Sequence, residues 1–192
     1  MPNKNERRLV LARLFLDVVS PMLDAGESYS DISVERLITA VDVSRSTFYS
    51  YFKDKGELLA AMAEDVTTDL SEAGGVWFAL ERPEAPEDLA AALRPLFTTY
   101  RRHQAILRSI TDGASYDASI RTLHTVLVKR AITELSVHFE RAGLEHDPVR
   151  TATWLVWMLE RGLYHVVAPA DDAEMELQLE ALADLLWRAL YA

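Results

Sequence analysis

The chain has 192 residues, a net charge of −10 and no cysteine, and 49% of its residues are hydrophobic. This length suits one small module and one larger core, and the composition is that of an ordinary globular protein. The absence of cysteine excludes disulfides, thiolate catalysis and cysteine-based metal centres. No apolar run is long enough to span a membrane and no signal-peptide pattern is visible, so a cytoplasmic location is expected.

The charge is unevenly distributed along the chain. Residues 1–56 carry eight Lys or Arg and eight Asp or Glu, whereas residues 57–192 carry twelve and twenty-two. A surface that binds nucleic acid therefore belongs in the N-terminal part, because neutralised phosphates supply much of such affinity. Without a broad basic field, binding there is expected to rest on a local cluster, Arg45, Lys53 and Lys55, and on dimerisation.

The spacing of apolar residues predicts an all-α protein with about nine helices and no strand. The first helix spans Glu6 to Asp24; Pro21 predicts a kink or an early end, and Gly26 a stop. A helix-turn-helix domain at residues 1–56 and a helical core at residues 57–192 are expected. Helices of the core are predicted at residues 54–71 (reaching the glycines at 74 and 75), 87–102, 103–111, 116–143, 148–168 and 172–191.

Two short helices between Ile32 and Phe52 begin with the same device. Ser33 and Ser44 each follow a β-branched apolar residue, and an apolar residue stands four positions after each serine, at Leu37 and Phe48. A serine that caps a helix and a hydrophobic staple beside it fix where the helix starts and its entry angle. The spacing of eleven residues between the two serines predicts a helix, a tight turn and a second helix.

The second of these helices has a buried face and a polar face. Phe48 and Phe52 lie one turn apart on the apolar side, while Ser46, Tyr49, Ser50 and Lys53 point the other way. Hydroxyl groups can bond base edges or phosphates, and Arg45 in the first turn can reach a guanine or the backbone. The N-terminus of the first short helix, near Ser33, favours a phosphate. A purely structural helical hairpin is the alternative interpretation.

The stretch from Asp31 to Leu58 resembles the DNA-binding signature of the TetR family, which it matches at DISV, at VSRSTFYSYFKDKGEL and at the spacing between them. The resemblance implies a homodimeric regulator with a three-helix DNA-binding domain and a helical core that binds an inducer. It departs from the family at Val41-Asp42, where Ala-Gly is usual, so Asp42 must take a positive φ. The expected DNA-contacting set is Ser33, Ser44, Arg45, Ser46, Thr47, Tyr49, Ser50, Tyr51, Lys53 and Lys55.

Two further stretches resemble one subgroup of the family, that of the ethionamide-resistance repressor. They are Leu159-Glu160-Arg161 and the segment from Leu186 to Tyr191. The helix expected at residues 148–168 is apolar nearly all round and must be covered on two sides. It is predicted to form an isologous dimer interface with the last helix, through Leu179, Leu182, Leu186 and Leu190.

Aromatic residues are spread over several helices of the core, which permits an apolar ligand pocket. Plain core packing is the alternative for each of them. The scarcity of central charges favours a neutral, elongated, hydrophobic ligand, with Tyr100, Tyr116, Thr153 and Tyr164 as hydrogen-bonding candidates. The predicted pocket consists of Trp77, Leu93, Phe97, Tyr100, Ile110, Tyr116, Leu123, Leu127, Trp154, Trp157, Met158, Tyr164 and Trp187.

No catalytic or metal-binding motif is apparent in the sequence, and no cofactor is expected. The five histidines are spread over four predicted segments, and only Glu134 and His138 are spaced to share a metal, for which a surface ion pair or hydrogen-bonded pair is the simpler explanation. The sequence thus favours a ligand-released, dimeric repressor of operator DNA. A ligand-binding or interaction protein of the same fold with weak or lost DNA binding is the main alternative, and an all-α enzyme with an apolar pocket is the third.

Overall fold

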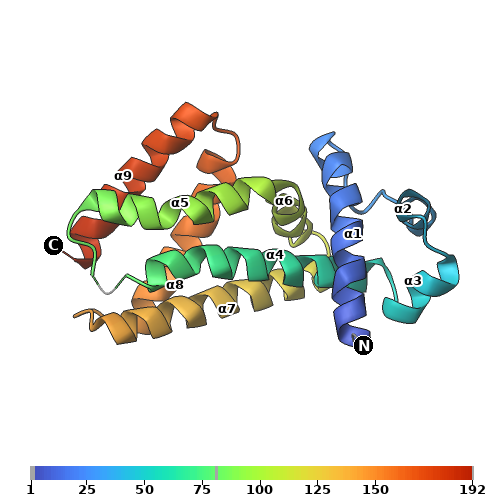
Figure 1. Cartoon of the computed structure of the whole chain (residues 1–192), viewed down its shortest axis with the longest axis horizontal. Helices are drawn as coiled ribbons and strands as arrows, with labels where there is room; N and C mark the ends of the chain where they lie inside the picture. Colours follow the sequence, from blue (N-terminus) through green and yellow to red (C-terminus); the bar gives the residue numbers. More distant parts are fainter. Residues whose placement is uncertain (1–2, 81, 192) are drawn as a thin grey trace. The chain divides into compact units, whose positions relative to one another are not determined.

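The computed structural model describes residues 3–80 and 82–191, which form nine α-helices and one π-helical turn and contain no strand (Figure 1). The predicted all-α class is confirmed. None of the helices in these two ranges is long and apolar enough to span a membrane. The elements are α1 (Lys4–Asp24), α2 (Val34–Val41), α3 (Arg45–Tyr51), α4 (Lys55–Phe78), α5 (Pro86–Arg102), α6 (Gln104–Gly113), α7 (Ala118–Ala142), α8 (Pro148–Gly162), the π-helical turn (Leu163–Val167) and α9 (Asp172–Leu190).

Contacts divide the chain into two compact units. The first contains the residues up to Thr68 together with Ala105–His124, and the second contains Asp69–Gln104 together with the residues from Thr125 onward. The division expected from the sequence, after residue 56, falls in the first turn of α4, and that helix continues through it. Helices α4 and α7 each contribute residues to both units.

Helix α1 begins and ends where its local sequence dictates. Asn3 and Glu6 form a capping box, in which the Glu6 N–H donates to Asn3 Oδ1 over 2.9 Å and the Asn3 N–H to Glu6 Oε2 over 2.8 Å. Pro21 does not end the helix early, because it stands in the last turn, where its missing N–H removes a single bond. The predicted stop at Gly26 is confirmed: with φ of +91°, its N–H donates to the carbonyl of Leu23.

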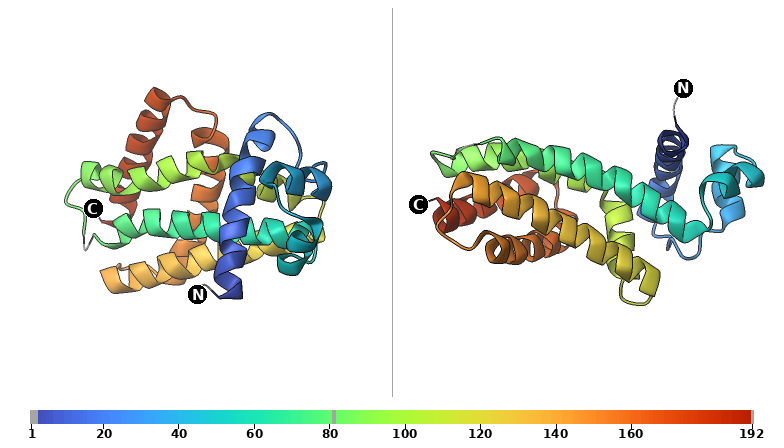
Figure 2. Two further views of the ribbon diagram at one scale, coloured as in Figure 1. Left: turned by 45° about the vertical axis from the view of Figure 1, so that its right-hand side comes forward. Right: turned by 90° about the horizontal axis from the view of Figure 1, so that it is seen from below.

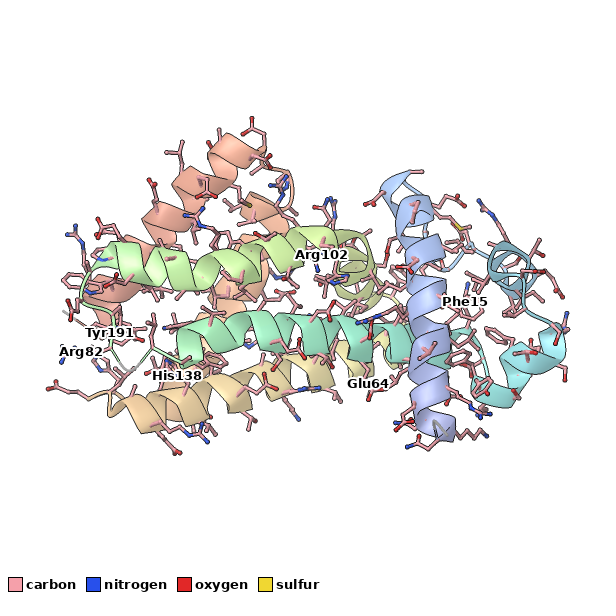
Figure 3. The ribbon with its side chains drawn as sticks, in the orientation of Figure 1. Phe15, Glu64, Arg82, Arg102, His138 and Tyr191 are labelled. Carbon is pink, nitrogen blue, oxygen red and sulfur yellow. The ribbon has the colours of Figure 1, made fainter. Side chains whose placement is uncertain are left out.

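In the first unit, an aromatic core joins α1 to α2 and α3. The side chain of Phe15 is fully buried and lies on the side of α1 that faces these two helices (Figure 3). Its ring meets those of Phe48 and Phe52 edge-on, with centroids 5.8 and 6.1 Å apart. An ion pair of 2.9 Å between Arg13 and Asp65 joins α1 to α4. Helix α1 therefore packs against the buried face of the helix-turn-helix.

In the second unit, α5 packs along α9, and the C-terminal half of α4 runs beside α7 (Figure 2). Leu179 and Leu186 of α9 are fully buried within the chain itself. Their prediction as dimer-interface residues is therefore wrong, because this stripe of α9 belongs to the core. Tyr191 follows α9, and its hydroxyl accepts a 3.1 Å hydrogen bond from Trp77 Nε1 of α4.

Glu134 and His138 on α7 do not form the surface pair that their spacing suggested. Glu134 accepts hydrogen bonds from Ser71 and from Arg130, both of 2.8 Å. His138 is buried and stacks on Phe78, with ring centroids 4.9 Å apart. Within residues 3–80 and 82–191, no three acidic or histidine side chains gather where they could hold a metal ion.

Candidate nucleic-acid interface

Each short helix of the helix-turn-helix starts at its predicted serine. Ser33 Oγ accepts from the N–H of Arg36 over 3.2 Å, and Ser44 Oγ accepts from the N–H of Thr47 over 3.0 Å. These bonds satisfy donors that the first turn of a helix leaves unpaired. The starts of α2 and α3 are therefore fixed by local chemistry, as the sequence predicts.

The turn between α2 and α3 is made by Asp42. Its φ of 54° and ψ of 47° lie in the left-handed region, as predicted for a residue at the position usually filled by Gly. The N–H of Val43 donates to the carbonyl of Ile38 over 3.0 Å, and that of Asp42 to the carbonyl of Thr39 over 3.3 Å. This pattern is a Schellman motif. The turn is thus closed without glycine, and a carboxylate is placed beside the start of α3.

Helix α3 has the two faces that the sequence predicts. Phe48 is fully buried, whereas the side chain of Tyr49 is 46% exposed. Ser46, Ser50 and Lys53 are also exposed. Tyr51 and Thr47 are half-buried, and the Ser44 and Thr47 hydroxyls lie 2.8 Å apart. The exposed face of α3 therefore carries hydroxyl groups, a phenol and a cation, which suit contacts with base edges and phosphates.

Arg45 is already engaged within the protein. Its guanidinium forms an ion pair with Glu35 of α2, and it lies 5.5 Å from the centre of the Tyr49 ring. The side chains of Arg45 and Glu35 remain 62% and 61% exposed. The arginine predicted to reach DNA is therefore accessible at the surface but paired with a carboxylate.

Lys55 is used differently from the prediction. Its ammonium group donates to three backbone carbonyls of the loop before α2, those of Tyr29 at 2.8 Å, Ser30 at 2.7 Å and Ile32 at 2.9 Å. An ammonium group has three donors, and all three are committed. Lys55 therefore clamps the loop that positions α2, and its assignment as a phosphate contact needs correction.

The Lys55 clamp is reciprocal. The Tyr29 hydroxyl is buried and donates to the carbonyl of Lys55 over 2.8 Å, while the Lys55 ammonium lies 5.1 Å from the Tyr29 ring centre. Burial raises the pKa of Tyr29 and lowers that of Lys55, and the charge of Asp31 opposes the latter shift. This role cannot be read from the sequence, because the lysine closely follows the recognition helix, where a phosphate contact is expected.

A second arginine of this unit is also paired. Arg36 of α2 binds Glu27 through both of its terminal nitrogens, with 2.8 Å between Nη2 and Oε1. This hydrogen-bonded pairing lowers the pKa of Glu27 and raises that of Arg36. Residues 1–56 carry equal numbers of positive and negative side chains, and two of the arginines among them, Arg36 and Arg45, form ion pairs within the helix-turn-helix region.

The residues predicted to line a ligand pocket differ widely in exposure. Trp77, Leu93, Phe97, Tyr100 and Ile110 are buried. Leu123, Leu127, Tyr164 and Trp187 are half-buried.

Four further members of the predicted set face outward. Tyr116, which precedes α7, is 66% exposed, and Trp154 of α8 is 79% exposed. Trp154 projects opposite the buried stripe formed by Ala152 and Val156, so it does not line an interior of its own chain. Trp157 and Met158 are 41% and 38% exposed. These four side chains are better placed to meet a partner than to enclose a ligand in one chain.

Helix α3 follows a tight turn, packs with α1 and α2 through its aromatic face and exposes its hydroxyl groups on the other. This arrangement is that of a helix-turn-helix DNA-binding domain. The comparisons with known proteins specify its kind: residues 25–62 match the model of the bacterial regulatory proteins of the tetR family. These residues are therefore similar to the DNA-binding part of tetR-family regulators, and the chain as a whole has the fold of TetR-family transcriptional regulators.

Solved structures match the chain over nearly its whole length. A TetR-family regulator from Mesorhizobium loti has 16% sequence identity and a TM-score of 0.71, covering 98% of this chain and 99% of its own. One from Syntrophomonas wolfei has 18% identity and a TM-score of 0.72, covering 96% of each chain. One from Pectobacterium atrosepticum has 21% identity and a TM-score of 0.68, covering 98% of this chain and 96% of its own. A search of curated proteins gave no significant match.

Proposed function

We propose that the protein is a dimeric transcriptional repressor that binds operator DNA through α3 and is released by a small apolar ligand. The observation that carries this proposal is the exposed face of α3, with Arg45 in its first turn and Tyr49 one turn further on. A helix of this kind enters the major groove with its N-terminal residues against base edges. Ser33, at the N-terminus of α2, would face a phosphate.

The proposed dimer uses the exposed apolar side chains of α8 and α9. Trp154 and Trp157 stand on α8, and Leu177 and Leu185 are 59% and 52% exposed on α9. Large apolar side chains that are exposed on neighbouring elements would, if they form one patch, be typical of an interaction site. The same surface of a second copy would cover them in an isologous interface. This arrangement keeps the two helices of the original prediction but replaces the buried leucines of α9 with exposed ones.

The proposed ligand site is the buried part of the predicted aromatic set, above all Trp77, Phe97 and Tyr100. An elongated, neutral, hydrophobic molecule suits these side chains, with the Tyr100 hydroxyl as a hydrogen-bonding group. In the proposed mechanism, the dimer sets the separation of two recognition helices near one DNA turn or a multiple of it. A ligand that selects another separation would then weaken DNA binding. We expect this activity in the cytoplasm, where operator DNA would be bound.

The resemblance to the subgroup of the ethionamide-resistance repressor, through Leu159-Glu160-Arg161 and the segment at residues 186–191, belongs to the same proposal.

The second candidate function is a ligand-binding or interaction protein of this fold with weak DNA binding. Three carboxylates favour it: Asp42 in the turn, Glu35 against Arg45, and Glu27 against Arg36. Negative charge near the recognition helix opposes approach to phosphates. The two candidate functions are compatible with the same fold and differ in the affinity of the protein for DNA.

The test is binding to the intergenic DNA upstream of the protein's own gene, measured by fluorescence anisotropy with the purified wild type and with a double variant, Arg45→Ala with Tyr49→Ala. Both substitutions are at exposed positions, so the variant should keep its helical circular dichroism. The proposal expects saturable binding by the wild type and its loss in the variant. Equal binding by both proteins, or no binding by the wild type, would count against it.

A further inference from the structure

The contact between Glu35 and Arg45 joins the two helices of the DNA-binding domain at their N-terminal turns. Glu35 is the second residue of α2 and Arg45 the first residue of α3. The Glu35 carboxylate pairs with the guanidinium, whose other contact is the ring of Tyr49. Both charged side chains are more than half exposed, so the pair can separate without any rearrangement of the core.

The Glu35 carboxylate binds Arg45 in the way that a DNA phosphate would. A guanidinium binds carboxylates and phosphates with the same planar donors, so one Arg45 donor held by Glu35 is a donor withheld from DNA. The first turn of α2 is also where a helix of this motif crosses the backbone, and a carboxylate there repels a phosphate. Glu35 therefore opposes binding in two ways, by holding the arginine and by its own charge.

We propose that Glu35 is an internal competitor for Arg45 that sets the affinity of the recognition helix for DNA and its dependence on salt. The proposal rests on the function proposed above, since it concerns the same face of α3. In the free protein Arg45 is neutralised by Glu35 and aligned over Tyr49. On DNA the guanidinium exchanges the carboxylate for a phosphate or a guanine edge. DNA sequences whose contacts with Arg45 do not compensate for the loss of the Glu35 ion pair are bound less tightly.

The competing role is distinct from a structural one, because an exposed ion pair contributes little to stability. Glu35 is not the cap of α2, a role that belongs to Ser33. Replacing Glu35 with Gln keeps the length and helix propensity of the side chain and removes its charge. The substitution should therefore leave the fold intact and change DNA binding alone.

The experiment compares wild type and Glu35→Gln on a fluorescent duplex of mixed sequence, about 40 base pairs long so that it offers several turns of major groove. Glu35→Gln should bind this DNA about threefold to fivefold more tightly, the upper range for release of an exposed ion pair. Between about 50 and 200 mM salt, the slope of log affinity against log salt should be more negative by at most about 0.9, because the variant meets DNA with one more uncompensated positive charge.

The matched control is Asp17→Asn, which removes one exposed carboxylate from α1 of the same unit. This variant measures the general effect of one fewer negative charge, and Glu35→Gln must exceed it in both affinity and slope. In an Arg45→Ala background, Glu35→Gln should give a clearly smaller gain than in the wild-type background, because only the repulsion by the carboxylate itself is then removed.

The outcomes separate the inference from the function on which it depends. Wild-type binding with an unchanged or weaker Glu35→Gln, or a full gain in the Arg45→Ala background, would overturn the competitor role and leave the repressor proposal standing. Absence of binding by wild type and Glu35→Gln alike would overturn both.

Discussion

Replacing Lys55 with Met separates a structural role for this lysine from a role in DNA binding. Met keeps most of the length and apolar stem of the side chain but removes the three hydrogen bonds to the carbonyls of Tyr29, Ser30 and Ile32. A hydrogen bond to a charged group contributes about 1.5–3 kcal/mol to stability. The three bonds share one ammonium group, so together they contribute less than three times this value. Part of this gain is offset by the desolvation that lowers the pKa of Lys55.

The expected loss from Lys55→Met is therefore about 2–4 kcal/mol in the free energy of unfolding, much more than a typical surface substitution. Urea denaturation followed by circular dichroism measures it. The matched control is Lys53→Met, two residues earlier at an exposed position, which should change stability by less than about 0.5 kcal/mol. Equal stability of the two variants, with DNA binding lost in Lys55→Met alone, would refute the clamp and restore Lys55 as a phosphate contact.

Three further outcomes follow from the structure. Asp42→Ala should lower the free energy of unfolding by about 0.5–1 kcal/mol, since Asp tolerates the left-handed region better than Ala, whereas Asp42→Gly should not lower it. Urea denaturation measures both, and an Ala variant more stable than the Gly variant would contradict this. Burial and the charge of Arg141 lower the pKa of His138, so this imidazole binds a proton more readily in the unfolded chain than in the folded one as pH falls toward and below about 6.5. Acidification from pH 7.5 to 5.5 should then destabilise wild type more than His138→Phe, and equal slopes would argue against it. Trp154→Glu should shift light-scattering mass from dimer to monomer while Val126→Glu, at another exposed apolar position, should not; a dimer in both variants would exclude the proposed interface.

The helix-turn-helix was predictable because its determinants are local. Ser33 and Ser44 bond atoms three residues away, and the left-handed Asp42 follows from its position in the turn. Such signals do not depend on how distant segments pack. The starts of α2 and α3 and the two faces of α3 could therefore be derived from the sequence alone.

The errors arose where a side chain's role depends on packing between segments distant in sequence. Lys55 has the sequence position of a phosphate contact, but the carbonyls that bind it come from a loop about 25 residues earlier. On α8, apolar residues on nearly every side hide which stripe faces inward, so Trp154 could be assigned to a pocket although it is exposed. Leu179 and Leu186 of α9 were assigned to a dimer interface because the sequence does not show that α5 of the same chain packs along α9.

Selection of binding sites from random duplex DNA tests the central claim most directly. The account predicts that the wild-type protein enriches an inverted repeat whose half-sites lie about one helical turn, or a multiple of it, apart. It also predicts that the variant carrying Arg45→Ala and Tyr49→Ala enriches nothing. Failure of the wild type to enrich any sequence, or enrichment of the same repeat by the variant, would contradict the assignment of α3 as the recognition helix of a DNA-binding dimer.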